Sequence, residues 1–244
     1  MRIFRFESVS STNGEIVRLL NGGVTPPFGV IAGGQTNGRG CHGNKWIGQD
    51  PGNIYFSAAL PVEIFSANSL PMFTQTFVLS LLVKLEKIIH LNVKWPNDIL
   101  FAGKKVGGVL LETCFSEKTF KNAVLGIGIN VASAPNLEDI PEAAYEATAL
   151  GAHLPSISRS FVLDNVIQAV IDAIDLYKRG VYAEFVANNW KIFDAFCHRQ
   201  INIRLGKTVF SGEALGVDAS GKLVLRVNAK KKLSFDSANA RIIL

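Results

Sequence analysis

The pattern of the chain changes at about residue 199, and this change restricts the fold more than any other feature. After His198 the sequence breaks into short runs of alternating apolar and polar residues, and glycines 206, 212, 216 and 221 mark turns between them. Several short strands within about 45 residues predict a small β-barrel. Residues 199–244 carry nine Lys or Arg against three acids, whereas residues 1–198 have a formal net charge of −1. We therefore expect two domains, residues 1–198 and residues 199–244.

The larger part of the chain mixes helices with strands. Its longest apolar segment, residues 72–90, has its polar side chains in one helical stripe (Thr76, Ser80, Lys84 and Lys87), which predicts a mostly buried helix. Further helices are expected at residues 161–177 and 182–193. Strands at 92–95, 106–114 and 123–129 follow one another across short turns. We therefore expect an α+β fold with a central mixed or antiparallel sheet and helices.

Composition excludes several classes of protein. Hydrophobic residues make up 48% of the 244 residues and charged residues 18%, which excludes a disordered chain. Charges interrupt every apolar run before it reaches the length of a membrane span, so we expect no membrane partner. The three cysteines are odd in number and widely spaced, which argues against a disulfide framework or a zinc ribbon. With no secretory signal at the start, we expect a cytoplasmic protein.

Three consecutive lysines, residues 230–232, allow two interpretations. A basic cluster can bind nucleic acid. A solvated hairpin tip has the same composition, and no set of aromatic residues for base stacking accompanies these lysines. We favour the hairpin tip and expect no specific binding to DNA.

A glycine-rich loop occupies residues 33–46 and contains Arg39. Such a loop can bring backbone N–H groups close to a phosphate, and an arginine adds a bidentate donor. An ordinary surface loop has this composition at least as often. The loop alone therefore leaves both interpretations open.

Two lysines and an aspartate form the second candidate site. Lys94 and Asp98 belong to the run Lys94-Trp95-Pro96-Asn97-Asp98, and Lys105 follows shortly after. We expect the two lysines on adjacent strands near one turn. Such a group suits an anionic, metal-bearing substrate such as a nucleoside triphosphate. The alternative is an ordinary charged hairpin with surface ion pairs.

The third candidate is the run Gly126-Ile127-Gly128-Ile129-Asn130. Alternating glycine and isoleucine give a strand with one smooth face, on which a flat apolar ligand can lie, with Asn130 at its end. A tightly packed core strand is the equally weighted alternative.

Taken together, these segments resemble the biotin–protein ligases (biotin–[acetyl-CoA-carboxylase] synthetases). The family pattern has Ser-Thr-Asn, a Gln-Thr-x-Gly-Arg-Gly loop ending in Trp, Lys-Trp-Pro-Asn-Asp, Lys-x-x-Gly-(Ile/Val)-Leu-x-Glu and Gly-x-Gly-x-Asn. This chain matches it at residues 11–13, 35–46, 94–98, 105–112 and 126–130. The resemblance spans essentially the whole chain. It implies a class II synthetase-like catalytic domain followed by an SH3-like barrel.

The resemblance also implies an activity. Family members use MgATP to convert biotin to biotinyl-5′-AMP, and then transfer biotin to a lysine of a biotin carboxyl carrier domain, usually that of a carboxylase such as acetyl-CoA carboxylase. ATP, Mg²⁺ and biotin are therefore the expected ligands. The resemblance leaves a homodimer open.

The family motifs assign roles to particular residues. The expected biotin-binding residues are Ser11, Thr12, Gln35, Gly38, Arg39, Gly108, Gly126 and Gly128. Lys105 is the expected catalytic cation between the biotin carboxylate and the α-phosphate, with Arg39 and Lys94 as further catalytic cations. The expected nucleotide-binding residues are Trp46, Asn97, Asp98 and Asn130, with Asp98 also facing Mg²⁺.

One position of the loop departs from the family pattern. Cys41 stands where the family has an arginine, so the position lacks a charge that helps to retain the adenylate. We expect weaker retention, or compensation by His42, Lys45 or another cation. A catalytic role for Cys41 as a nucleophile is disfavoured because nothing in the sequence other than the adjacent His42 places a base beside it.

Other functions remain as alternatives. A lipoate or octanoate ligase shares the catalytic fold, and a non-catalytic biotin- or adenylate-binding protein would retain the pocket. Because the Ser-Thr-Asn motif begins at residue 11, we expect no winged helix-turn-helix and no repressor function.

Overall fold

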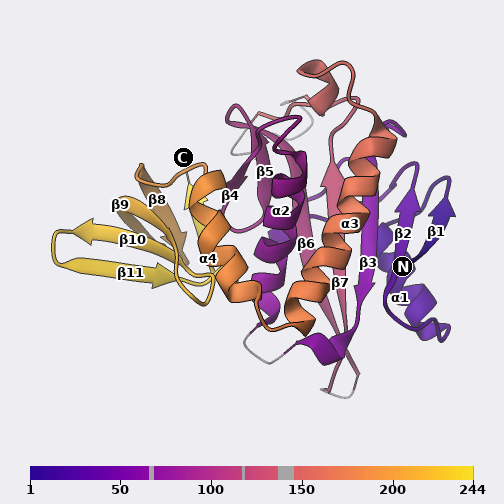
Figure 1. Ribbon diagram of the computed structural model, residues 1–244, viewed down its shortest axis with the longest axis horizontal. Coiled ribbons are helices and arrows are strands. Elements are labelled where there is room, and N and C mark those ends of the chain that lie inside the picture. The colour runs from indigo at the N-terminus through magenta and orange to yellow at the C-terminus, as the bar shows by residue number, and fades with distance from the viewer. Residues whose placement is uncertain (66–68, 117–118, 137–145, 244) are drawn as a thin grey trace.

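The computed structural model describes residues 1–65, 69–116, 119–136 and 146–243. In this part of the chain the strands form two sheets (Figure 1). The first sheet contains β1 (Arg2–Phe6), β2 (Phe28–Ala32), β3 (Ile54–Leu60), β4 (Asn92–Lys94), β5 (Asp98–Phe101), β6 (Lys104–Ser116) and β7 (Thr119–Ile129). The second contains β8 (Gln200–Leu205), β9 (Thr208–Val217), β10 (Leu223–Asn228), β11 (Lys231–Phe235) and β12 (Ala240–Ile243). The α-helices are α1 (Thr12–Asn21), α2 (Leu70–Leu85), α3 (Arg159–Lys178) and α4 (Tyr182–Phe193).

The first sheet is mixed. Its strand order is β1-β2-β3-β7-β6-β5-β4, with β1 parallel to β2 and the other neighbours antiparallel. The second sheet is antiparallel throughout, in the order β11-β10-β9-β8-β12. The expected α+β class, with a small all-β unit at the C-terminal end, is confirmed.

The two faces of the first sheet differ in chemistry because side chains alternate along each strand. Gly108 pairs with Gly128 and Leu110 with Gly126, so these residues share one face. The intervening Val109 and Ile127 point to the opposite face and lie in the main core. The Gly-x-Gly pattern therefore gives one face with little side-chain volume and one apolar face.

The helices divide between these faces. α2, α3 and α4 cover the apolar face, which is turned to the viewer in Figure 1. On the other side, α1 places Ile16 against Phe28, Val30 and Ala59. The glycine pairs are thus left beside α1, where a ligand could approach them.

A turn of the second sheet packs against the first. Gly221, with φ +77°, lies between β9 and β10, and a side chain there would collide with Gln75 of α2. The Gly221 carbonyl accepts hydrogen bonds from Gln75 Nε2 (2.7 Å) and Trp95 Nε1 (3.1 Å). Trp95, within the Lys-Trp-Pro-Asn-Asp motif, is thereby fixed by the C-terminal sheet. The second sheet begins at Gln200, next to the predicted boundary, and the assignment of residues 199–244 to a separate domain stays a prediction.

Several sequence-based element predictions were wrong in detail. The helix predicted at 72–90 is α2, which ends at Leu85, and Thr76 and Ser80 of its polar stripe are buried. The strand β5, which begins at the last residue of the Lys-Trp-Pro-Asn-Asp run, and the edge strand β1 were not predicted. Both are short, and β1 is stabilised by pairing with β2 from a distant part of the chain, which local pattern cannot reveal.

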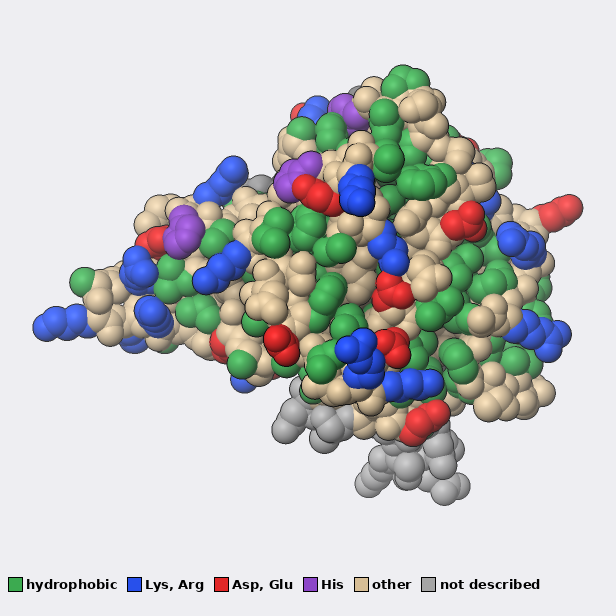
Figure 2. Space-filling model, in the orientation of Figure 1, with side chains coloured by type: hydrophobic (Ala, Val, Ile, Leu, Met, Phe, Trp, Pro, Cys, Tyr) green, Lys and Arg blue, Asp and Glu red, His purple; other side chains and the backbone are tan. Residues whose placement is uncertain are grey.

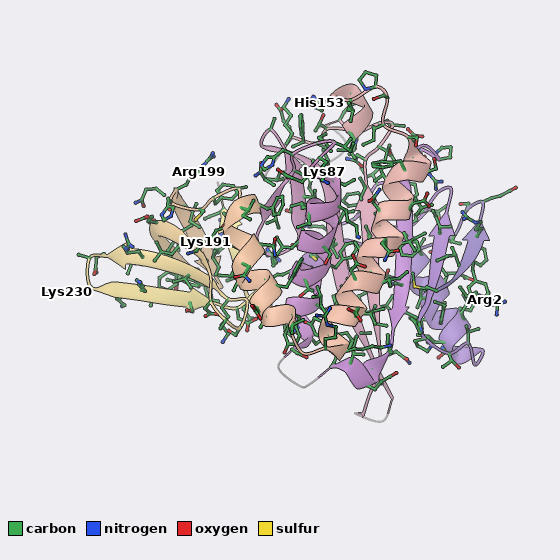
Figure 3. All side chains as sticks on the ribbon, in the orientation of Figure 1. Arg2, Lys87, His153, Lys191, Arg199 and Lys230 are labelled. Carbon is green, nitrogen blue, oxygen red and sulfur yellow. The ribbon has the colours of Figure 1, made fainter. Side chains whose placement is uncertain are left out.

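The lysine cluster lies where a hairpin tip was expected. Lys230 is at the turn between β10 and β11, at the end of the molecule remote from the first sheet (Figure 3). The same end carries several exposed basic side chains (Figure 2). No helix in the described ranges is long and apolar enough to cross a membrane.

Candidate active site

The register of the sheet aligns the predicted site residues in one row. Lys94 of β4 pairs with Asp98 of β5, Asp98 pairs with Gly108 of β6, and Gly108 pairs with Gly128 of β7. Directly opposed residues share a face. Three cross-strand pairings therefore connect a charged end, Lys94 and Asp98, to two glycines, Gly108 and Gly128, which we call the glycine floor.

The charged end contains both predicted lysines. Lys105 Nζ lies 2.5 Å from Asp98 Oδ1, and Lys94 Nζ lies 3.7 Å from Asp98 Oδ2. Burial lowers the pKa of Lys94 to about 8, although Asp98 acts in the opposite direction. The expectation that the lysines lie on adjacent strands was wrong, because β5 lies between β4 and β6. The lysines meet through Asp98, which β5 supplies.

Trp46 covers the glycine floor. A Cβ at Gly128 would lie 2.2 Å from the indole, so this position must be glycine for the ring to pack there, and a Cβ at Gly108 would make a tight contact of 3.2 Å with the same ring. Lys105 Nζ lies 5.7 Å from the ring centroid, within the range of a cation–π contact. The indole Nε1 is buried without a hydrogen-bond partner among the described residues. The ring was expected beside adenine, and the structure places it on the surface expected to accept biotin.

Cys41 is enclosed by neighbouring protein atoms. Its Sγ lies 3.1 Å from Asn97 Nδ2 and 3.5 Å from the carbonyl oxygen of Val109. Burial, with a further contribution from Asp98, raises the pKa of the Cys41 thiol to about 11. The side chain is therefore a protonated thiol at neutral pH, which argues against a nucleophilic role. The side chain of His42 lies outside the described part of the structure.

A buried polar group forms where α1 begins. Gln35 Oε1 accepts hydrogen bonds from the Thr12 backbone N–H (2.8 Å) and the Thr12 hydroxyl (3.1 Å). Ser11 stands at the N-cap position of α1, but its side chain makes no capping hydrogen bond. The loop that carries Gln35 is thereby tied to the first turn of α1.

Ser57 and Asn13 extend this group under the glycine floor. The Ser57 hydroxyl lies 2.7 Å from Thr12 Oγ1 and 2.5 Å from Asn13 Oδ1, and a Cβ at Gly126 would lie 2.5 Å from the same Asn13 atom. Neither residue was assigned a role from the sequence. A serine within the apolar run Ile54–Leu60 was the available signal, since a polar group on a buried strand needs a partner.

Arg39 is held by an acid that the sequence also left without a role. Arg39 Nη2 lies 2.9 Å from Glu112 Oε2, and the two side chains keep 46% and 34% of their exposure. Gly38 precedes this arginine, and a Cβ there would lie 2.4 Å from the Trp46 carbonyl oxygen. The loop therefore folds closely on itself, with its arginine turned to β6.

The two predicted asparagines are engaged by the protein. Asn97 Nδ2 donates to the Val109 carbonyl (2.7 Å), and Asn130 Nδ2 donates to the Thr148 carbonyl (3.3 Å). Each amide thus fixes a neighbouring segment. Asn97 Nδ2 also donates to Cys41 Sγ, which leaves its side-chain oxygen to meet a nucleotide, whereas Asn130 keeps its oxygen and one N–H.

A magnesium ion would have one protein ligand here. The described residues contain no cluster of three or more His, Cys, Asp or Glu side chains suited to a metal. Mg²⁺ commonly takes one or two carboxylates and completes its coordination with water and substrate phosphates. Asp98 fits such an ion when it arrives with a nucleotide.

Comparison with known proteins assigns the family. The family model for the biotin/lipoate A/B protein ligases matches residues 6–130, which include every predicted site residue. The chain belongs to this family. The resemblance found in the sequence motifs is thereby confirmed.

Individual members of the family match most of the chain. A biotin–[acetyl-CoA-carboxylase] ligase from Paracoccus denitrificans is 29% identical over 91% of this chain and 93% of its own length. A bifunctional ligase/repressor from Bacillus subtilis is 29% identical over 90% of this chain, which covers 68% of that protein. The solved structure of a biotin protein ligase from Aquifex aeolicus in complex with biotin and ATP superposes with a TM-score of 0.83, at 27% identity, covering 99% of this chain and 98% of the other.

Proposed function

We propose that this protein uses ATP to convert biotin to biotinyl-5′-AMP and then transfers biotin to a lysine of a biotin carboxyl carrier domain, that of acetyl-CoA carboxylase or a related carboxylase. Relatives bearing the ligase name and a similar structure that binds biotin and ATP support this activity. The observation that carries it is the row of Lys94, Asp98, Gly108 and Gly128, which sets a cationic cluster directly beside a glycine floor.

The first half-reaction joins two anions. A biotin carboxylate oxygen attacks the α-phosphorus of ATP, the bond to the β-phosphate oxygen breaks, and pyrophosphate leaves. In this proposal Lys105 stabilises the negative charge that builds between carboxylate and phosphate. Arg39 supplies further donors from the loop above the floor. Fixed cations lower the barrier because they remove repulsion between the reactants and hold them together.

The biotin head group belongs at the start of α1. Ser11, Thr12 and Gln35 offer hydrogen-bonding groups there, and Gly38, Gly126 and Gly128 allow close approach of a ring. Because the Trp46 indole lies on this floor, binding of biotin must move it. The displaced ring can then cover the ligand and exclude water from the adenylate, which water would hydrolyse.

The nucleotide belongs at the charged end. Lys94 would bind its phosphates, assisted by Asn97 and Asn130, while Asp98 would hold a magnesium ion that neutralises phosphate charge. Asp98 pairs with Lys105 in the structure, so Lys105 would have to leave this ion pair to reach the α-phosphate.

The second half-reaction uses the adenylate. The carrier lysine amine attacks the acyl carbon, the bond to the AMP oxygen breaks, and the nitrogen loses a proton. A homodimer, the absence of DNA binding and a cytoplasmic location stay predictions.

The test is ATP–pyrophosphate exchange, which isolates the first half-reaction. We expect exchange that depends on biotin, with none above background for lipoate or octanoate. Lipoate-dependent exchange would identify the other branch of the family, and biotin binding without exchange would identify a binding protein. Lys105→Met should abolish exchange, whereas the matched control Lys104→Met should not, since Lys104 forms an exposed ion pair with Glu146 at 2.6 Å. Addition of a biotin carboxyl carrier domain then tests transfer.

A further inference from the structure

One carboxylate oxygen connects two parts of the proposed site. Glu112 Oε2 lies 2.6 Å from Asn13 Nδ2 and 2.9 Å from Arg39 Nη2. Asn13 lies on α1 and is buried, whereas Arg39 lies on the loop and is half exposed. Glu112 itself lies on the long strand β6, paired with Val124 of β7. A central strand of the sheet thus holds both the floor and the loop.

The bond to Glu112 fixes the orientation of Asn13. An ionised carboxylate can only accept hydrogen bonds, so the amide must turn its NH₂ group toward Glu112. The amide oxygen then points to the Ser57 hydroxyl, 2.5 Å away. Ser57 in turn contacts Thr12, which binds Gln35. An unbroken set of contacts therefore runs from the loop arginine to the residues proposed to bind the biotin head group.

The position of Glu112 also determines what Arg39 can do. Only Nη2 of the guanidinium is engaged by the carboxylate. The other guanidinium N–H groups make no hydrogen bond to the described residues, so they can meet an anion. An arginine already held in place loses less side-chain entropy when it binds that anion.

We propose that Glu112 is a positioning residue that couples the biotin head-group pocket to the loop arginine. It orients Asn13 on one side and pre-organises Arg39 on the other, so that biotin meets an assembled site. The inference rests on the proposed function. It assigns to Glu112 no contact with the reacting atoms.

A double-mutant cycle tests this coupling. The proteins are wild type, Glu112→Gln, Arg39→Gln and the double variant, and the measurements are the calorimetric Kd for biotin and kcat and KM for biotin in ATP–pyrophosphate exchange. Glutamine keeps the size of the side chain but removes its charge. We expect Glu112→Gln to raise the Kd for biotin about tenfold in the wild-type background. In the Arg39→Gln background, the factor by which the same substitution raises the Kd should be less than half as large.

A structural role would give a different pattern. If Glu112 only stabilised the fold, its replacement would lower Tm and change the biotin Kd by the same factor in both backgrounds, which would overturn the inference. The Kd is measured without turnover, so a nearly inactive Arg39 variant is still informative.

A matched control lies in the second sheet. Glu213 also has two partners, Arg226 at 2.9 Å and His198 at 2.9 Å. Arg226, like Arg39, is about half exposed. Glu213→Gln should leave the biotin Kd within twofold of wild type. If the wild-type protein shows no biotin-dependent exchange, the proposed function is refuted. If the wild type is active and Glu112→Gln leaves the Kd for biotin unchanged, only the role of Glu112 is refuted.

Discussion

The buried Lys94 should make ATP binding depend on pH. Its side chain keeps only 10% of its exposure, and burial lowers its pKa to about 8. Bound phosphates favour the charged amine of Lys94. At a pH where this amine is neutral in the free enzyme, ATP binding is therefore coupled to its protonation. From pH 7 to pH 9 the protonated fraction falls from about nine tenths to about one tenth, and KM for ATP should rise about tenfold, a change of ~1.4 kcal/mol.

The assay is ATP–pyrophosphate exchange at saturating biotin between pH 6.5 and pH 9.5. Lys94→Arg provides the control, because a guanidinium keeps its charge throughout this range. The pH dependence should disappear in that variant even if its KM at pH 7 is higher. A KM for ATP that stays constant from pH 7 to pH 9 in wild type, or a rise that persists unchanged in Lys94→Arg, would refute the assignment.

Three further substitutions have defined outcomes. Cys41→Arg adds the missing loop charge near two acids and should slow release of the adenylate about tenfold, while overpacking costs about 1–3 kcal/mol of stability; stopped-flow release and thermal unfolding measure the two effects. Gly128→Ala puts a methyl group on the floor that the biotin ring is proposed to approach closely, so biotin affinity should fall at least tenfold in calorimetry, about 1.4 kcal/mol or more. Trp95→Phe removes the hydrogen bond to Gly221 and should lower the free energy of unfolding in urea by about 1–2 kcal/mol. Unchanged values would contradict each packing argument.

Much of the sheet could be predicted from the sequence because the patterns that indicate its strands are local. Glycine and isoleucine alternate at residues 126–129, and this pattern identified both the strand and its smooth face. The helices α3 and α4 were found for the same reason, since their apolar residues recur at helical spacing. Local pattern could not reveal that β5 separates the two lysines, because the strand is only four residues long.

The contacts within the site could not be predicted in the same way. Glu112 and Asn13 are 99 residues apart, and their hydrogen bond exists only because β6 and α1 meet on one face of the sheet. The position of Trp46 likewise depends on the loop folding over β6 and β7. Motifs indicated which residues gather at the site, but not which of them hold one another in place.

The Gly221 carbonyl has a consequence for synthesis of the chain. It accepts hydrogen bonds from Gln75 and Trp95, which leave the ribosome well over one hundred residues earlier. Until that acceptor arrives, the buried indole N–H of Trp95 lacks this hydrogen-bond partner. A nascent polypeptide can therefore complete most of the first sheet before the turn that anchors Trp95 has been synthesised.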